Sequence, residues 1–199
     1  MIESERLLIR PVSMADLDDM FEYAKDEETG PRAGWPPHKT KEDSKKIIEM
    51  WLNPDYKERV FSIIYKADNK MIGTVGLQEL NKVQKDSKNT YVKDLIKQGK
   101  KLIEIGITLS KQYWGIGIAT EVIKMVKPYI FIENNADIAI ATHFEANIGS
   151  KRAQEKNDMK EVYSFKSDEN WFNTDCNITI VRAQTKEEWL ERQAEIDKE

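Results

Sequence analysis

The sequence predicts an α/β domain in which a mixed β-sheet carries helices on both faces. Short apolar runs rich in β-branched and aromatic residues recur between clusters of turn residues, which is typical of strands. Segments between them repeat apolar residues every three or four positions, which is typical of amphipathic helices. With 199 residues, of which 40% are hydrophobic and 33% charged, the chain is long enough for one well-buried core. We therefore expect a single domain over residues 1–199.

The N-terminal half is predicted to combine three strands with two helices. One helix is expected to start after Ser13 and a second at Thr40, where apolar residues recur at helical spacing. A loop rich in glycine and proline is expected between them. Strands are expected at residues 6–10, 60–65 and 71–80, the last two as a hairpin.

Residues 81–101 form a charged insertion before the next predicted strand. They are rich in Lys, Asn and Asp, yet Tyr91, Val92, Leu95 and Ile96 recur at helical spacing. The simpler interpretation, slightly favoured, is a solvated linker with one or two helical turns. The alternative is a lid over a substrate, because long ordered insertions in compact domains tend to be functional.

The C-terminal half is predicted to continue the sheet. A strand begins at Leu102, and a helix follows a glycine turn and ends near Pro128. Further strands are predicted at residues 138–142, 161–165 and 177–181. The run from Thr185 to Glu188 fits a capping box, which predicts a C-terminal helix over residues 185–197.

The glycine turn before that first helix is the most informative segment. Gly115 and Gly117 lack a Cβ atom, so the backbone can approach a ligand closely. Ala119, further along, has only a methyl side chain and also leaves room for a ligand. The first N–H groups of the helix have no intrahelical acceptor and lie at the positive end of its dipole. The segment predicts a site for a phosphate-sized anion, although glycines also precede helices that bind nothing.

The spacing around this turn disfavours two common phosphate-binding motifs. No Lys-Ser or Lys-Thr pair follows it, as a P-loop requires. The run Gly115-Ile116-Gly117-Ile118-Ala119 also lacks the glycine spacing of a dinucleotide-binding fingerprint. A nucleotide-binding domain of either kind is therefore disfavoured.

The run Trp114-Gly115-Ile116-Gly117-Ile118-Ala119 resembles the pyrophosphate-binding motif of the GNAT acyltransferases. That motif usually reads Arg or Gln, two residues, Gly, one residue, then Gly or Ala. The longer stretch from Tyr113 to Glu121 is most similar to the RimJ/RimL-type branch of N-acetyltransferases. Three further segments resemble the family in the order that it requires, namely Glu5 to Pro11, Lys70 to Leu77, and Asn147 to Met159.

Three positions depart from the family pattern. Trp114 is interpreted as standing where many relatives carry Arg or Gln. Asp158 replaces a glycine and Met159 replaces a phenylalanine. Asp tolerates the left-handed backbone conformation better than most residues, so we expect the turn at residue 158 to survive. The resemblance covers nearly the whole chain apart from the charged insertion and the C-terminal tail.

The resemblance implies the GNAT fold, a mostly antiparallel mixed sheet whose fourth and fifth strands splay apart. The splay would hold the pantetheine arm of acetyl-CoA as an added strand, with no metal required. Carried over to this chain, the cofactor-binding positions are Ile107, Thr108, Leu109, Trp114, Gly115, Ile116, Gly117, Ile118, Ala119, Thr120, Asn147 and Ser150.

Acetyl transfer to an amine needs a neutral amine, a polarised carbonyl and a proton for the departing thiolate, but no covalent nucleophile. The Asn147 amide suits the pantetheine amides, and the Ser150 hydroxyl could hydrogen-bond the departing sulfur, as in the RimL-type enzymes that the chain resembles. Many GNAT enzymes place a tyrosine acid where this chain has Gln154, which has no ionisable proton. Asn147 and Ser150 could instead only cap the following helix.

Glu104 is the candidate general base, since the resemblance puts it on the strand beside the splay. A carboxylate there could take the amine proton directly or through water, but it could equally point away and form a surface ion pair. Glu79 and His143 are the reserve candidates, and a structural role is the simpler interpretation of His143.

The acceptor is expected to be an amine, either of a small molecule or of a peptide. A formal net charge of -4 suits a cationic acceptor and argues mildly against nucleic acid. The run Trp35-Pro36-Pro37-His38 is expected to form the other wall of the pocket, unless Trp35 only fills the core. The sequence leaves open which amine is used and whether the protein is a monomer or a homodimer.

The cysteine content and the N terminus favour a cytoplasmic protein that is neither exported nor bound to a membrane. The single Cys176 cannot form an internal disulfide, and one thiol with two histidines makes no metal cluster. No signal-like region follows Met1, and no apolar run approaches bilayer length. The alternative to an enzyme is a binding-only module that keeps the acyl-CoA-binding fold for regulation or assembly.

Overall fold

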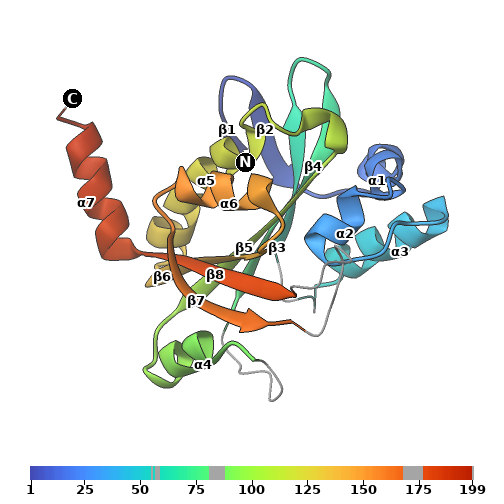
Figure 1. Ribbon diagram of the computed structural model, residues 1–199. Helices are drawn as coiled ribbons and strands as arrows, with labels where there is room; N and C mark the ends of the chain where they lie inside the picture. Colours follow the sequence, from blue (N-terminus) through green and yellow to red (C-terminus); the bar gives the residue numbers. More distant parts are fainter. Residues whose placement is uncertain (55, 57–58, 81–87, 168–176, 199) are drawn as a thin grey trace.

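The computed structural model describes residues 1–54, 56, 59–80, 88–167 and 177–198 (Figure 1). Its strands are β1 (Ile2–Glu3), β2 (Leu7–Pro11), β3 (Arg59–Tyr65), β4 (Lys70–Glu79), β5 (Leu102–Leu109), β6 (Ile138–Phe144), β7 (Lys160–Lys166) and β8 (Ile178–Thr185). Its α-helices are α1 (Leu17–Ala24), α2 (Thr29–Ala33), α3 (Lys41–Leu52), α4 (Thr90–Lys97), α5 (Ile118–Pro128), α6 (Ile148–Glu155) and α7 (Lys186–Ile196). Short 3-10 turns η1 (Met14–Asp16) and η2 (Lys111–Tyr113) precede α1 and α5, and the π-helical η3 (Tyr129–Glu133) follows α5.

The described strands form one eight-stranded sheet in the order β1-β2-β3-β4-β5-β6-β8-β7. Its neighbours pair antiparallel, with the exception of β5 and β6, which run parallel. The predicted mixed, mostly antiparallel sheet is thus confirmed. Because the two-residue β1 precedes the first predicted strand, the predicted fourth and fifth strands are β5 and β6.

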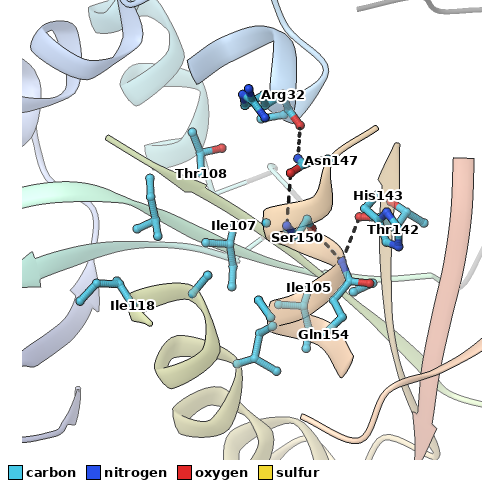
Figure 2. Close-up of a pocket in the computed structure, with 18 of the residues that line it drawn as sticks. Arg32, Ile105, Ile107, Thr108, Ile118, Thr142, His143, Asn147, Ser150 and Gln154 are labelled. Carbon is cyan, nitrogen blue, oxygen red and sulfur yellow. Dashed lines mark hydrogen bonds between the residues drawn. The ribbon is translucent and has the colours of Figure 1, made fainter. Parts of the chain in front are cut away.

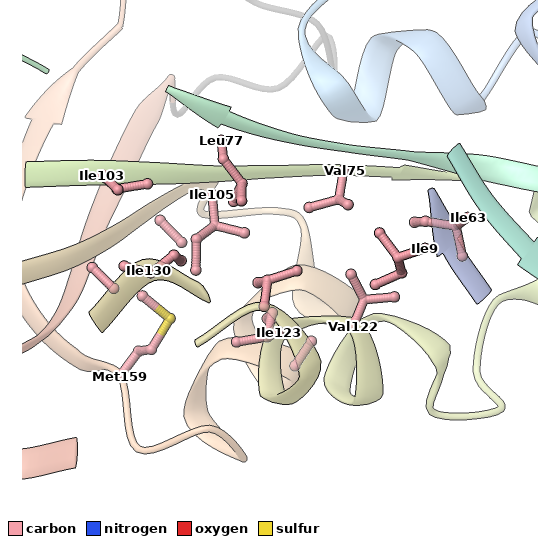
Figure 3. Close-up of a cluster of buried hydrophobic side chains, with 14 of the residues drawn as sticks. Ile9, Ile63, Val75, Leu77, Ile103, Ile105, Val122, Ile123, Ile130 and Met159 are labelled. Carbon is pink, nitrogen blue, oxygen red and sulfur yellow. The ribbon is translucent and has the colours of Figure 1, made fainter. Parts of the chain in front are cut away.

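Helices cover both faces of this sheet, as predicted. On one face, α5 and η3 bury apolar side chains against the central strands, and this main cluster includes Ile105, Val122 and Ile130 (Figure 3). The helix α7 joins it through Trp189, whose ring stacks on Phe131 at 5.3 Å between centroids. We call this side the α5 face. The other side, called the α1 face, is covered by α1 and α3 at one end and by α4 at the other.

The sheet parts between β5 and β6. Their parallel pairing covers only three positions and ends where Glu104 lies beside Ile140. Beyond that point β5 continues to Leu109, paired with β4 alone, and β6 continues to Phe144, paired with β8 alone. The splay that the resemblance implied is therefore present, and its two edges open toward the N-termini of α5 and α6.

One segment folds differently from the sequence prediction. The helix α2 lies in part of the stretch that was predicted as a loop. The Asp26 carboxylate starts it by accepting the backbone N–H groups of Glu28 and Thr29, each at 2.9 Å. Pro31 fits in its first turn because the N–H that proline lacks would have no helical partner there.

The predicted insertion contains a helix that covers the sheet. Apolar residues of α4, among them Val92 and Leu95, pack on the α1 face against a cluster that includes Leu102, Ile140 and Val181. Among the described residues, α4 does not line the cavity described below, so it does not act as a lid in this structure. Residues 81–87 of the insertion and Cys176 lie outside the described residues.

Two local features follow from the backbone. Gly73 lets a neighbouring strand approach closely, since a Cβ atom there would lie 2.1 Å from the Thr108 carbonyl oxygen. Asp158 adopts a left-handed conformation with φ of 59°, so the turn survives without a glycine, and Met159 is buried in the main cluster. In the described part of the chain, no helix has the length and apolar character needed to span a bilayer.

Candidate functional site

A cavity of about 710 Å³ opens where β5 and β6 part (Figure 2). Side chains alternate along a strand, so β5 contributes to it on both faces of the sheet. Ile105 and Ile107 line it on the α5 face, whereas Glu104 and Thr108 line it on the α1 face. The cavity thus passes through the sheet and connects the start of α5 with the space beneath α2 and α3.

The backbone of β5 presents hydrogen-bonding groups to the splay at alternate residues. The Leu102 carbonyl accepts the Leu80 N–H at 3.0 Å, and the Ser110 N–H donates to the Ile72 carbonyl at 2.7 Å. The backbone groups of the even-numbered residues of β5 therefore face β4. Lys101 pairs with the start of β6 instead. The odd-numbered Ile107 and Leu109, which lie beyond the parallel pairing with β6, therefore turn their N–H and C=O groups toward the gap.

This alternation corrects one predicted cofactor contact. The backbone of Thr108 is directed at β4, so it cannot form a strand-like ladder with a ligand in the splay. Its side chain lines the cavity from the α1 face instead. Ile107 keeps the predicted orientation, and the carbonyl of Leu109 accepts the indole N–H of Trp114 at 2.8 Å.

The glycine turn forms an open helix start. Gly115 and Gly117 have φ of 77° and 85°, values that L-residues with side chains rarely adopt. Gly117 is the N-cap of α5 and supplies no capping side chain, so the first N–H groups of the helix have no protein side chain over them at this cap. Six of the predicted cofactor-binding residues of this segment line the cavity, namely Trp114, Gly115, Gly117, Ile118, Ala119 and Thr120.

Ile116, also predicted to bind the cofactor, is directed away from the cavity. Its side chain is 49% exposed, and its carbonyl oxygen accepts a hydrogen bond from Arg6 Nη1 at 3.1 Å. Arg6 also pairs with the Glu121 carboxylate in the first turn of α5, and Ser4 donates to the same carboxylate at 2.5 Å. Burial alone would raise the pKa of Glu121, but the hydrogen bonds from Ser4 and Arg6 hold it below its usual value. The segment between β1 and β2 thus holds the glycine turn and the first turn of α5 together.

Asn147 caps α6, as the simpler interpretation held. Its Oδ1 accepts the Ser150 N–H at 3.2 Å, and its Nδ2 donates to the Arg32 carbonyl at 3.2 Å (Figure 2). The amide is therefore engaged on both sides, although Asn147 still lines the cavity. This arrangement closes the start of α6, in contrast to the open start of α5.

Ser150 presents its hydroxyl to the same cavity. Its Oγ accepts a hydrogen bond from Gln154 Nε2 at 2.9 Å, and Gln154 Nε2 also lies 3.3 Å from the Thr142 carbonyl (Figure 2). Because the Ser150 oxygen already accepts from Gln154, its own proton is directed elsewhere. Gln154 is 3% exposed, and its Oε1 has no hydrogen-bond partner among the described residues.

Glu104 lies at the point where the strands part. Its carboxylate accepts a hydrogen bond from the Thr142 hydroxyl at 3.1 Å, across the last paired position of β5 and β6. Both side chains are on the α1 face and line the cavity. Glu79, a reserve candidate for the base, pairs instead with Lys101 at 3.7 Å and does not line it.

His143 lines the cavity, but its ring is held by contacts within the protein. Its Nδ1 lies 2.9 Å from the Phe144 carbonyl, and its Nε2 accepts from Arg182 at 3.4 Å. Burial lowers its pKa, and the nearby Arg182 charge acts in the same direction, so the neutral ring is favoured. Arg182 is itself buried and paired with Glu155 at 2.9 Å. Both ring nitrogens of His143 are thus in use.

Aromatic residues line the cavity on the α1 face. Trp35 does so and also packs on the core cluster beneath α1 and α3, so it does not only fill the core. Pro36, Pro37 and His38 of the same predicted run are not among the residues that line the cavity. Trp51 from α3 lines the cavity beside it. The Arg32 guanidinium lies 5.0 Å from the Trp114 ring centroid, which joins α2 to the glycine turn through a cation–π contact.

Sequence reasoning missed residues that act on the site from a distance along the chain. Arg6 and Arg32 come from segments more than 80 residues before the glycine turn, so no local pattern marks them. Gln112 stands three residues before Gly115, at the Arg or Gln position of the family motif, so the placement of Trp114 at that position was wrong, as the spacing alone shows.

A family model described as an acetyltransferase (GNAT) domain matches residues 6–160. The uncharacterized N-acetyltransferase p20 of Bacillus licheniformis is 27% identical to the chain over 134 residues. That match covers 66% of this chain and 66% of the relative, just under two thirds of its length.

Solved structures share the fold. An acetyltransferase (GNAT family) from Bacillus anthracis has a TM-score of 0.69 at 23% identity and covers 94% of this chain and 98% of its own. A spermidine N-acetyltransferase from Vibrio cholerae, solved in complex with CoA and spermine, has a TM-score of 0.71 at 16% identity and covers 94% and 99%. At these identities the likeness establishes the fold.

The open start of α5 can be tested by closing it. We expect Gly117→Val to weaken acetyl-CoA binding by about tenfold or more in calorimetry, since a side chain there blocks backbone approach. Gly99→Val is the matched control, because Gly99 also has a left-handed φ, of 76°, and open space around it but lies outside the cavity. Both variants lose stability from backbone strain, and only Gly117→Val loses affinity. A folded Gly117→Val protein with unchanged affinity would contradict the assignment.

Proposed function

The chain belongs to the GNAT acetyltransferase family, and we propose that it transfers an acetyl group from acetyl-CoA to a primary amine by direct attack in a ternary complex. The observation that carries this proposal is one continuous cavity that joins the open start of α5 to the Ser150 hydroxyl and the Glu104 carboxylate. A site of this form brings two substrates together without a covalent enzyme intermediate. We assign the chain to the RimJ/RimL-type branch on its motif.

The residues present fit acetyl-CoA. The glycine turn offers backbone N–H groups at a helix start, where a pyrophosphate is favoured by both hydrogen bonds and the helix dipole. The backbone groups of Ile107 face the splay, where the amides of a pantetheine arm would find strand-like partners. When bound, acetyl-CoA supplies an activated thioester. No protein nucleophile is then required.

Ser150 is proposed to donate a hydrogen bond to the sulfur as the thioester bond breaks and the thiolate departs. Gln154 holds the Ser150 oxygen by donating to it, which leaves the hydroxyl proton for the cavity. A hydrogen bond to developing thiolate charge is stronger in the transition state than in the ground state, so it favours transfer more than binding. Gln154 acts here as a positioning residue.

Glu104 is proposed to take the proton from the attacking amine. It lies on the α1 face, on the other side of the sheet from the start of α5, so an amine that enters from that side meets the carboxylate first. The Thr142 hydroxyl orients one carboxylate oxygen. A carboxylate at this point of the cavity can accept a proton directly or through one water.

The acceptor is proposed to be a small-molecule or peptide amine, used without nucleic acid, and the protein to act as a monomer or homodimer. The structural neighbour from Vibrio cholerae is described with an amine acceptor, spermine, and with CoA. The net charge of -4 suits such cations. With a single cysteine in the chain, a reducing, cytoplasmic compartment is also proposed.

The function is tested by titrating the protein with acetyl-CoA and then measuring thiol release against a panel of amines. We expect acetyl-CoA to bind and thiol release to depend on an amine. Binding without amine-dependent release across the panel would favour the non-catalytic module. No binding of acetyl-CoA at all would contradict the proposal as a whole.

Replacement of Ser150 tests the leaving-group role. We expect Ser150→Ala to lower kcat by about 10- to 100-fold while acetyl-CoA affinity changes much less, because the lost hydrogen bond acts mainly in the transition state. Ser164→Ala, on an exposed part of β7 outside the cavity, is the control. Equal turnover of Ser150→Ala and wild type would leave Ser150 with a structural role only.

Replacement of Glu104 tests the base. We expect Glu104→Gln to keep acetyl-CoA binding and to lose most transfer to an amine that is protonated at neutral pH. Activity should recover in part at higher pH, as free amine becomes available. Glu79→Gln, on the adjacent strand, should match wild type. If the two variants behave the other way round, or Glu104→Gln follows the wild-type pH profile, Glu104 is not the base.

A further inference from the structure

On the α1 face of the sheet, two adjacent glycines, Gly76 and Gly106, leave a patch without side chains in the cavity, which we call the glycine patch. Gly106 on β5 lies directly opposite Gly76 on β4, and Val60 on β3 lies opposite Gly76, so the three form one row across the sheet. Residues opposite one another in antiparallel strands point to the same face. The row therefore has a side chain only at Val60. All three residues line the cavity.

The neighbouring rows and clusters enclose this patch. On one side lie Thr74 and Thr108, and on the other lies Glu104, all directed to the same face. The apolar cluster beneath α1 and α3, to which Trp35 and Trp51 belong, ends on one side of it. The cluster beneath α4 begins on the other side with Leu102. The gap between the two clusters is thus a hollow with a glycine floor next to the proposed base.

The space above Gly106 is open. A Cβ atom built on it would have no heavy atom within 4 Å, whereas one built on Gly73 would meet backbone at 2.1 Å. The φ of Gly106 is not left-handed, so its backbone does not require glycine. Glycine in a strand interior lowers stability relative to residues with side chains, and strand packing does not account for it here. The glycine at position 106 is therefore explained by the open space that it leaves in the cavity.

We propose that Gly106 is a specificity-determining residue, and that the glycine patch receives a bulky apolar substituent of the acceptor amine. The walls contributed by Trp35, Trp51 and Val60 are apolar and broad, which matches a ring or branched chain. Glu104, one row away, then faces the amine that carries this substituent. The inference rests on the proposed acetyltransferase function and names its acceptor class.

The test uses three acceptors that share one reacting group and differ only in side chain: glycinamide, leucinamide and phenylalaninamide. We expect wild-type protein to use phenylalaninamide with the highest kcat/KM. Gly106→Val should lower that value by about tenfold or more while glycinamide changes by about twofold at most, because the added methyl groups occupy the hollow. Acetyl-CoA affinity and thermal stability should not fall.

Controls keep the outcome decisive. Gly106→Ala should show a smaller loss in the same order of acceptors, and it carries the test if Gly106→Val fails to fold. Ser164→Val adds the same side chain to an exposed position on β7 outside the cavity and should change no acceptor. A loss equal for all three amides, or none, would overturn the proposal. A wild-type preference for glycinamide would overturn it while leaving the acetyltransferase function intact. Use of none of the three, with acetyl-CoA bound, would count against both.

Discussion

The end of pairing between β5 and β6 is the constraint on which the rest of the structure depends. A strand edge carries N–H and C=O groups that need partners, and burying them without partners is costly. After Glu104 and Ile140 the two strands diverge, and Ile107 turns such groups to the gap. The divergence therefore creates the cavity and leaves backbone groups in it that water or a ligand with amide groups can pair with.

Two helices begin beside the splay and are capped in opposite ways. Asn147 closes the start of α6 with its side chain, whereas Gly117 leaves the start of α5 open. An anion is favoured only where helix N–H groups remain available, so the difference between an asparagine and a glycine decides which helix start can bind phosphate. At the closed start, the Asn147 side chain instead accepts the Ser150 N–H.

The helix α2 joins the two sides of the splay. Lys111 in the turn after β5 pairs with Glu28, and Trp114 contacts the Arg32 guanidinium, while Asn147 on the β6 side donates to the Arg32 carbonyl. On the opposite face, Arg6 holds both Ile116 and Glu121. These contacts fix the opening without a ligand, and a site already in its binding geometry loses less conformational entropy on binding.

Local patterns in the sequence determined most of the secondary-structure elements and the open helix start at the glycine turn. The period of apolar residues marked most strands and helices, the capping box marked α7, and Gly115 and Gly117 marked the open helix start, because each of these signals is contained within one or two turns of chain. The motif also placed Ser150 and Glu104 near the site. The stretch that became α2 was missed, since Pro31 and the flanking glycines resemble loop residues and the cap comes from Asp26.

Tertiary structure alone decided how these parts face one another. Which backbone groups of β5 point into the splay depends on its register with β4, and this excluded Thr108 and retained Ile107. The contacts of Arg6 and Arg32 join positions more than 80 residues apart, and the bare patch at Gly106 exists only because Gly76 lies opposite it. Sequence periodicity fixes which face a side chain takes, but the partner across a strand pair follows only from the register of the folded sheet.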